Sequence, residues 1–113
     1  MTEGLITFAD WKKLDLRVGK IVSVEDHPDA ERLYVADVDL GDMGKRKVVA
    51  GLKKHYTKKA LTGKLCIFLS NLEPAVIRGV KSEGMILAAG DEKNDQVQIL
   101  APSKKIALGS RVN

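Results

Sequence analysis

The fold is decided by one stretch near the start of the chain, Leu14-Asp15-Leu16-Arg17-Val18-Gly19-Lys20-Ile21-Val22-Ser23-Val24. Leucines and valines occupy alternate positions along most of it, which predicts one long β-strand. Gly19 lies in the middle, and a glycine inside a strand often marks a bulge or a sharp bend. A long, bent first strand is what a small barrel needs in order to curl back and close.

Outside this stretch, the sequence alternates between short apolar runs and polar turns. We expect further strands at residues 34–40, 45–50, 64–70, 82–89 and 96–100, and short helical turns at residues 25–33 and 58–61. The strand at 64–70 is apolar enough to be buried on both faces. The predicted fold is therefore all-β, an OB-fold, which is a five-stranded Greek-key barrel, with one or two short helices and a C-terminal extension. Periodicity alone does not distinguish it from an SH3-like barrel.

The length of 113 residues fits a single domain, residues 1–113. Residues 1–13 are expected to form an N-terminal arm, with Phe8 and Trp11 as apolar anchors. Residues 96–113 are expected to form the C-terminal extension, which is too apolar at its end to be free coil. The longest apolar runs are far shorter than the ~20 residues that span a bilayer, and the N-terminus lacks the apolar core of a signal peptide. We therefore expect a cytoplasmic protein with no membrane partner.

Charge is distributed unevenly along the chain. Residues 1–42 hold five basic and ten acidic side chains, although the net charge of the whole chain is +4. Residues 43–72, called here the acid-free stretch, hold eight basic side chains and no acidic one. These cations are Lys45, Arg46, Lys47, Lys53, Lys54, Lys58, Lys59 and Lys64. A solvated surface is the plain alternative, but a stretch of one sign is more suggestive of a polyanionic partner, because no local charge neutralises it.

Residues 71–85 carry basic and hydroxyl side chains between two apolar runs. Such a connection displays hydrogen-bond donors on a rigid scaffold, where binding residues tend to lie. No nucleophile–base pair, phosphate-binding loop or metal-ligand spacing accompanies it, so we expect neither an enzyme nor a bound metal or cofactor. His27 and His55 are expected to have structural or loop roles, and Cys66 is expected to be a small buried hydrophobe.

Several short motifs follow one another along the chain. They are Leu14-Asp15-Leu16-Arg17-Val18-Gly19-Lys20-Ile21, His27-Pro28-Asp29-Ala30, Leu33-Tyr34-Val35, Val38-Asp39-Leu40-Gly41, Val48-Val49-Ala50-Gly51-Leu52, Asn71-Leu72 with Pro74, Arg78-Gly79, and Ser82-Glu83-Gly84-Met85. Together they resemble the tRNA-binding domain family, which includes free-standing dimeric tRNA-binding proteins, domains appended to methionyl- and some tyrosyl-tRNA synthetases, and endothelial-monocyte-activating polypeptide. The resemblance implies an OB-fold that recognises tRNA by shape near the outside corner of the L, with little sequence preference.

Carried over position by position, the resemblance implies RNA-facing roles for Asn71, Arg78, Ser82 and Met85. Arg78 can fork onto a phosphate, and the short polar groups can reach the RNA backbone or a 2′-OH. Lys81, beside Ser82, is added as a phosphate contact. Two alternatives stay open: Asn71 could hold the following turn through its own backbone, and Met85 could pack in the core. Glycines in the same segment are expected to set backbone geometry.

This chain departs from the family pattern in two ways. Glu73 and Val76 stand where basic residues are common, whereas Lys58 and Lys59 stand where acids are common. We therefore expect much of the phosphate contact to come from the acid-free stretch, through Lys45, Arg46, Lys47, Lys53, Lys54, Lys58 and Lys59.

The resemblance also implies partners beyond tRNA, namely a methionyl- or another aminoacyl-tRNA synthetase and a second copy of the chain. Homodimerisation is expected through the terminal segments, because apolar residues such as Phe8, Trp11 and Ile106 lie at both ends. The alternative is that these residues only close the ends of the barrel. The runner-up function is a protein-interaction module, either chaperone-like and related to export or cytokine-like. The chaperone relatives lack motifs of the types at residues 27–30 and 82–85, which argues against the first of these.

Overall fold

The computed structural model describes residues 4–113 of the chain. Its elements in order are α1 (Phe8–Lys13), β1 (Leu16–Asp26), β2 (Tyr34–Asp39), the 3-10 turn η1 (Gly41–Met43), β3 (Lys45–Ala50), α2 (Lys58–Leu61), β4 (Leu65–Leu69), β5 (Ala75–Ile77), β6 (Val80–Ser82), β7 (Met85–Ile86), β8 (Ala88–Asp91) and β9 (Gln96–Ile99). Each short α-helix begins after a threonine whose hydroxyl accepts a backbone N–H, Thr7 for α1 and Thr57 for α2. Within residues 4–113, no helix has the length and apolar character that crossing a membrane requires.

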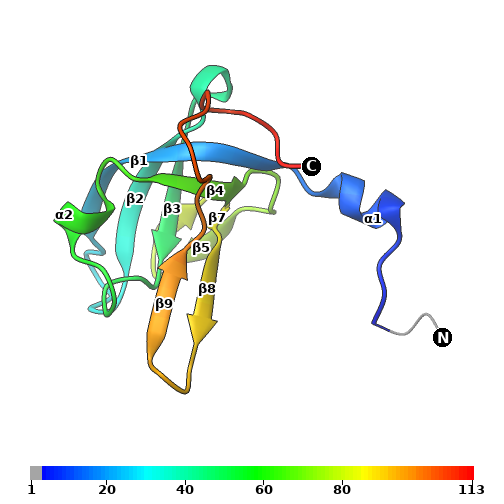
Figure 1. Cartoon of the computed structure of the whole chain (residues 1–113). Helices are drawn as coiled ribbons and strands as arrows, with labels where there is room; N and C mark the ends of the chain where they lie inside the picture. The colour runs from blue at the N-terminus through cyan, green and yellow to red at the C-terminus, as the bar shows by residue number, and fades with distance from the viewer. Residues whose placement is uncertain (1–3) are drawn as a thin grey trace.

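Five antiparallel strands form one sheet in the order β3-β2-β1-β4-β7, and this sheet curls into a barrel (Figure 1). β1 is shared between two neighbours, because residues 16–20 pair with β4 and residues 20–26 pair with β2. The pairing with β2 changes register between Ile21 and Ser23, as at a β-bulge. The long, bent first strand predicted from the alternation is confirmed.

Gly19 has a role different from the bulge that its position suggested. A β-carbon at Gly19 would lie 2.5 Å from Val38 Cγ1 and 2.9 Å from Leu40 Cδ2. β1 therefore crosses the core too closely to carry a side chain at this point. The bulge itself lies a few residues further along the strand.

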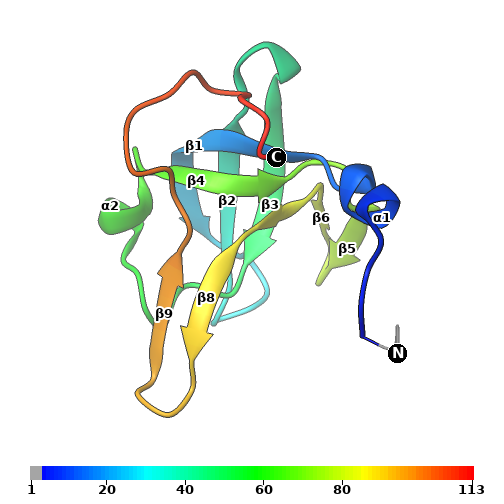
Figure 2. The ribbon, with the colours of Figure 1, turned by 45° about the vertical axis from the view of Figure 1, so that its right-hand side comes forward.

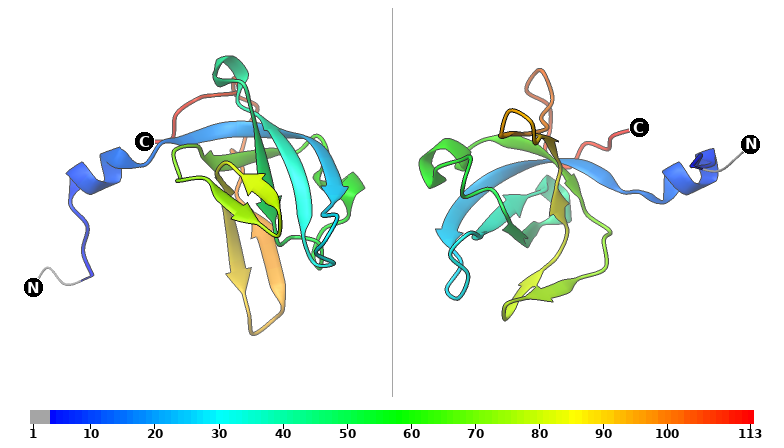
Figure 3. Two further views of the ribbon diagram at one scale, coloured as in Figure 1. Left: turned by 180° about the vertical axis from the view of Figure 1, so that it is seen from behind. Right: turned by 90° about the horizontal axis from the view of Figure 1, so that it is seen from below.

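The barrel closes where β3 meets the residues that join β6 to β7. Glu83 N–H donates to Lys47 O at 2.8 Å, and Val49 N–H donates to Ser82 Oγ at 3.0 Å. These bonds satisfy backbone groups on the edge of β3. Figure 2 and Figure 3 show the resulting barrel with two hairpins outside it, β5–β6 and β8–β9. This nearly closed five-stranded barrel confirms the predicted OB-fold.

The core fills the interior of the barrel. Alternate residues of β2 are buried, as predicted for the strand at 34–40. The largest fully buried side chains are Phe68, Ile21, Leu40, Leu61, Val38, Val48 and Cys66. The strand predicted at 45–50 and the short helix predicted at 58–61 are confirmed with the same bounds.

The two ends of the chain are placed differently. The C-terminal tail runs beside the first half of β1, where β2 does not reach: Val18 N–H donates to Ser110 O at 2.9 Å, and Gly109 N–H donates to Val18 O at 2.8 Å. Residues 4–13 of the arm stand away from the barrel and include α1 (Figure 1). Phe8 on this arm is 73% exposed. Phe8, predicted to be an apolar anchor, is therefore not buried against this barrel.

Two predicted elements are wrong. Residues 25–33 form no helical turn, because β1 continues to Asp26 and hydrogen-bonded turns follow it. The strand predicted at 82–89 is instead divided among the end of β6, β7 and β8. The division occurs at Gly84, whose φ of 149° is one that side chains rarely adopt, and where a β-carbon would overlap the ring of Phe68.

Two further expectations are corrected in detail. β4 is buried on one face only, with Cys66 and Phe68 inside and the alternate residues half-buried. The segment 71–85, expected to be a connection, contains the hairpin β5–β6.

Candidate nucleic-acid interface

The hairpin β5–β6 presents Arg78 at its tip. Ile77 pairs with Val80, so Arg78 and Gly79 form a two-residue turn. Both have positive φ, 51° for Arg78 and 89° for Gly79, which is the backbone geometry of a type I′ hairpin turn. Such a φ is unusual for a residue with a side chain. The Arg78 side chain is exposed, and its Nη2 donates to Asp29 O at 2.9 Å.

His27 fastens this hairpin to the turn that follows β1. The residue is buried, and both ring nitrogens make hydrogen bonds. Asp29 N–H donates to Nδ1 at 2.9 Å, so the proton must be on Nε2, which donates to Ile77 O at 2.9 Å. The structural role expected for His27 is therefore a specific one. The motif at residues 27–30 marked His27 in the sequence, but nothing in the sequence indicated that its ring bonds to Ile77.

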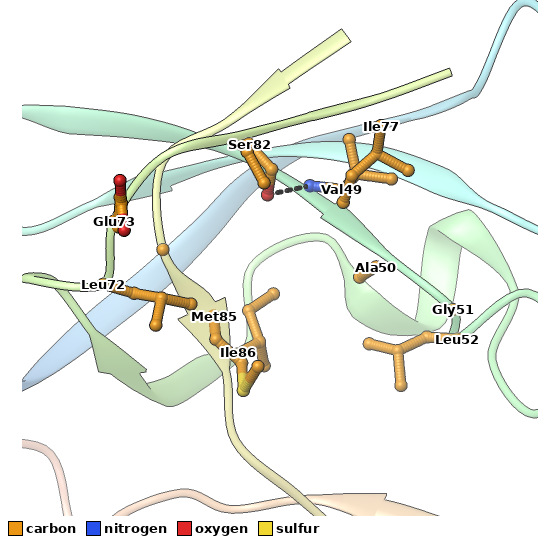
Figure 4. Close-up of a pocket in the computed structure, with 12 residues that line it drawn as sticks. Val49, Ala50, Gly51, Leu52, Leu72, Glu73, Ile77, Ser82, Met85 and Ile86 are labelled. Atoms are coloured by element: carbon orange, nitrogen blue, oxygen red, sulfur yellow. Dashed lines mark hydrogen bonds between the residues drawn. The ribbon is translucent and has the colours of Figure 1, made fainter. Parts of the chain in front are cut away.

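Ser82 is turned into the barrel rather than toward solvent. It is 5% exposed, and its hydroxyl accepts the Val49 N–H that helps to close the barrel (Figure 4). Asn71 is also engaged with the protein itself. Its Oδ1 accepts Asp15 N–H at 2.9 Å, and its Nδ2 donates to Lys13 O at 2.6 Å. The Asn71 side chain therefore bonds to the backbone at the C-terminal end of the arm and not to the turn that follows it.

A shallow apolar depression of about 390 Å³ lies between β3, the hairpin and β7. Leu72, Met85 and Ile86 line one side of it, and Leu52 lies across from them (Figure 4). Met85 is 47% exposed, so the alternative that it packs in the core is wrong. Glu73 is the charged residue of the lining. On the outer side of the hairpin, Lys81 is exposed.

The acid-free stretch is neutralised in part by carboxylates from other segments. Four of its eight cations form ion pairs: Lys47 with Asp37 at 3.3 Å, Lys53 with Asp26 at 3.0 Å, Lys54 with Asp95 at 3.2 Å and Lys58 with Asp26 at 2.9 Å. No acidic residue within the stretch neutralises it, as the sequence shows, but the fold brings carboxylates of other segments to four of its lysines.

The pairing changes how these groups titrate. Hydrogen bonds from Lys58 and Lys53 hold the pKa of Asp26 below its ordinary value, and the Asp26 partner raises the pKa of Lys58. Hydrogen bonds from His55 and Lys54 likewise lower the pKa of Asp95. These carboxylates therefore stay charged and keep their lysines occupied at neutral pH.

The remaining cations of the stretch are less constrained. Within the part of the chain that the structure describes, Lys45, Lys59 and Lys64 have no ion pair. Arg46 donates to Met43 O at 2.7 Å and is half-buried.

Apart from Lys45 and Arg46, which lie at the start of β3, the predicted site residues fall into two groups. Lys47 lies beside the hairpin residues, since its carbonyl accepts the Glu83 N–H. The lysines at 53, 54, 58 and 59 lie together around the loop before α2 and line one shallow hollow. The turn at residues 27–32 lies between the groups, with Asp29 bonded to Arg78 and Arg32 beside Lys53.

Residues 4–113 contain neither a reactive cysteine nor a metal-binding cluster. Burial raises the pKa of the Cys66 thiol to about 12, which leaves it protonated at neutral pH. Residues 4–113 contain no cluster of three or more His, Cys, Asp or Glu side chains placed to hold a metal ion.

Residues 16–111 match the family model described as "Putative tRNA binding domain", and the chain belongs to this family. It is 51% identical over 107 residues to the methionine–tRNA ligase of Thermococcus onnurineus, and 46% identical over 101 residues to the cytoplasmic tyrosine–tRNA ligase of Gallus gallus. These matches cover 95% and 88% of this chain but only 14% and 19% of the two ligases.

Solved structures give the same fold. The MetRS-related protein from Pyrococcus horikoshii superposes with a TM-score of 0.87 at 29% identity, covering 96% of this chain and 97% of that one. The chaperone CsaA from Bacillus anthracis also has a TM-score of 0.87, at 27% identity, covering 97% of this chain and 100% of that one.

Proposed function

We propose that this chain binds folded tRNA, without catalysing a reaction on it, and that it raises the tRNA affinity of a methionyl- or another aminoacyl-tRNA synthetase. The observation that carries the proposal is the family membership over residues 16–111. The chain spans 14% of the methionine–tRNA ligase it matches, so the ligase activity of that relative is not assigned to it. A tethered domain raises the local concentration of tRNA near a catalytic site without any new chemistry.

The proposed contact surface is the outer side of the hairpin β5–β6. Arg78 and Lys81 are exposed there and would bind phosphates, while Met85 offers an apolar contact to a ribose or base. RNA duplexes hide their base edges in a deep, narrow groove, so phosphate and 2′-OH contacts dominate their recognition. Asn71 and Ser82 are proposed to act indirectly, because their polar atoms already hold the arm and close the barrel.

Cations of the acid-free stretch would extend this surface in two directions, to the start of β3 through Lys45 and to the loop before α2 through Lys59. The unpaired Lys45 and Lys59 are proposed to contribute more than the four paired lysines, because no carboxylate has to be displaced from them. Arg46 is proposed to contribute least, since it is half-buried and bonded to a backbone carbonyl.

The test is a titration of unfractionated folded tRNA, and of an unstructured RNA of equal length, at several salt concentrations. Wild-type protein should prefer the folded tRNA and lose affinity as salt rises. Arg78→Gln/Lys81→Gln should weaken binding roughly tenfold or more and reduce the salt slope by about 2, one for each phosphate contact. Lys93→Gln, in the turn between β8 and β9, is the control for loss of a surface charge. Equal affinity for the two RNAs, or binding that ignores salt, would refute shape-selective tRNA binding.

A second candidate function is a chaperone-like protein-interaction module. It is supported by the likeness to the structure of the chaperone CsaA from Bacillus anthracis. The apolar depression beside Met85 could accept an apolar side chain of a client. A labelled unfolded protein that binds equally well with and without saturating tRNA would favour this function over the first.

We further propose that two copies associate through the arms, in the cytoplasm. Leu5, Ile6 and Phe8 are 67–73% exposed on an arm that stands off the barrel, and burying them against a second copy would remove apolar surface from water. Sedimentation at micromolar concentration is the test. A single 12.3 kDa species would contradict the dimer.

A further inference from the structure

His27 holds the tip of the hairpin through a closed set of hydrogen bonds. Its Nδ1 accepts Asp29 N–H, its Nε2 donates to Ile77 O, and Arg78 donates to Asp29 O, each at 2.9 Å. Two consecutive hairpin residues are thereby bonded to two residues of one short turn. His27 as a whole is 5% exposed, so water has little access to compete for its ring nitrogens.

The hairpin needs such support because it is short. Only three residue pairs join β5 to β6, and an isolated two-stranded hairpin is marginally stable in water. Most of its side chains are exposed, with Val76 at 73%. The tip also has an unfavourable backbone, since the positive φ of Arg78 is disfavoured for a residue with a side chain. Without bonds to the turn, little would fix the position of the Arg78 guanidinium.

We infer that His27 is a positioning residue for RNA binding: it fixes the hairpin against the turn so that Arg78 meets a phosphate without first being ordered. This inference rests on the proposed tRNA-binding function. The ordering of a mobile, charged side chain would otherwise be subtracted from the binding free energy. The Asp29 carbonyl uses one of the five N–H donors of Arg78, which leaves the others for a phosphate.

Two substitutions separate the two bonds of the ring. His27→Gln places an amide nitrogen near the position of Nε2 and can still donate to Ile77 O. His27→Asn places an oxygen near the position of Nδ1 and can still accept Asp29 N–H, but it loses the bond from the ring to Ile77 O. Both variants remove the ring and part of its packing, so each serves as the structural control for the other.

The experiment measures the affinity for unfractionated folded tRNA at several salt concentrations, in the wild-type and Arg78→Gln backgrounds. We expect His27→Asn to weaken binding roughly five- to tenfold and His27→Gln to stay within about threefold of wild type. In the Arg78→Gln background, both should have less than about a twofold effect, because the group they position is gone. Equal losses for Asn and Gln, or losses that persist without Arg78, would overturn the inference.

A second measurement does not depend on how stable the variants are. Nitrogen NMR of the free wild-type protein should find His27 as the neutral tautomer with its proton on Nε2, and the hairpin amides should be protected from exchange. A proton on Nδ1 would overturn the inference directly. Failure of wild-type protein to bind tRNA would instead refute the proposed function, and the tautomer would be unaffected.

Discussion

Residues 71–85 and the acid-free stretch are both rich in polar side chains, but the two segments differ in which of these side chains bond within the protein. In residues 71–85 the short polar side chains of Asn71 and Ser82 bond to the protein itself, and the long cations Arg78 and Lys81 stay outside. In the acid-free stretch the long side chains are on the surface too, but half of them are held by carboxylates from other segments.

The difference shows what makes a polar residue available to a ligand. The length of the side chain matters first, because the polar atoms of serine and asparagine lie close to the backbone and readily form hydrogen bonds to backbone groups. The neighbouring strand matters next. β2 and β3 pair so that Asp37 lies opposite Lys47, and this register decides that Lys47 is neutralised. Neither factor is visible from the density of charge along the chain.

The largest effect is expected at Gly84, on the side of residues 71–85 that faces the barrel interior. Gly84→Ala would place a β-carbon in the Phe68 ring and 2.6 Å from Leu69 O, at a φ of 149°. We expect a loss of about 3 kcal/mol or more in the free energy of unfolding, because overpacking and backbone strain add. Urea unfolding followed by circular dichroism measures this loss.

Gly79→Ala is the matched control on the outward side of the same segment. Its φ is 89°, but no atom lies within 4 Å of the added carbon. Only the backbone strain applies, so the expected loss is about 1 kcal/mol. Similar losses in the free energy of unfolding for the two alanine variants would contradict the view that Gly84 faces the core and Gly79 faces solvent.

The next effect separates stability from binding at neighbouring positions. Ser82→Ala leaves the part-buried Val49 N–H without its acceptor, so the free energy of unfolding should fall by about 1 kcal/mol. Lys81→Ala, on an exposed side chain, should change it by less than about 0.5 kcal/mol. The salt slope of tRNA binding should do the reverse, falling by about 1 for Lys81→Ala and staying unchanged for Ser82→Ala. Because a neutral hydroxyl neutralises no phosphate charge, direct contact of Ser82 with RNA would instead lower the tRNA affinity of the folded Ser82→Ala variant at an unchanged slope, and such a loss would contradict its indirect role.

The elements that could be predicted from the sequence are those that depend on neighbouring residues, and the others depend on contacts between distant parts of the chain. The alternation of β2 and the bounds of β3 and α2 were predictable, because period and capping are local properties. The break at Gly84 was not, because it depends on the ring of Phe68 meeting it across the barrel. The helical turn predicted at 25–33 failed for a similar reason, since His27 organises that turn together with Ile77 of the hairpin, fifty residues away.

The site was predicted at the level of a segment rather than of single residues. Arg78 and Lys81 are exposed as a binding surface requires, and their role in RNA binding stays a prediction. Asn71 and Ser82 carried the same motif signal, although their polar atoms bond within the protein. A motif residue that shapes a site and one that touches a ligand look alike in one sequence, and only burial and partners distinguish them.

The smallest expected effect tests the acid-free stretch from the opposite direction, by releasing cations instead of removing them. Asp26→Asn should free Lys53 and Lys58, so tRNA affinity should rise about two- to threefold and the salt slope should steepen by about 1. Asp42→Asn adds the same net charge in η1 and is the control. The lowered pKa of Asp26 fixes the sign of the pH dependence: its pairing stabilises the fold above the unfolded pKa of about 3.9 and is lost as pH falls through the folded value. The difference in unfolding midpoint between wild type and Asp26→Asn should therefore vanish at low pH. If Asp42→Asn raises tRNA affinity as much as Asp26→Asn does, net charge matters and the individual ion pairs do not.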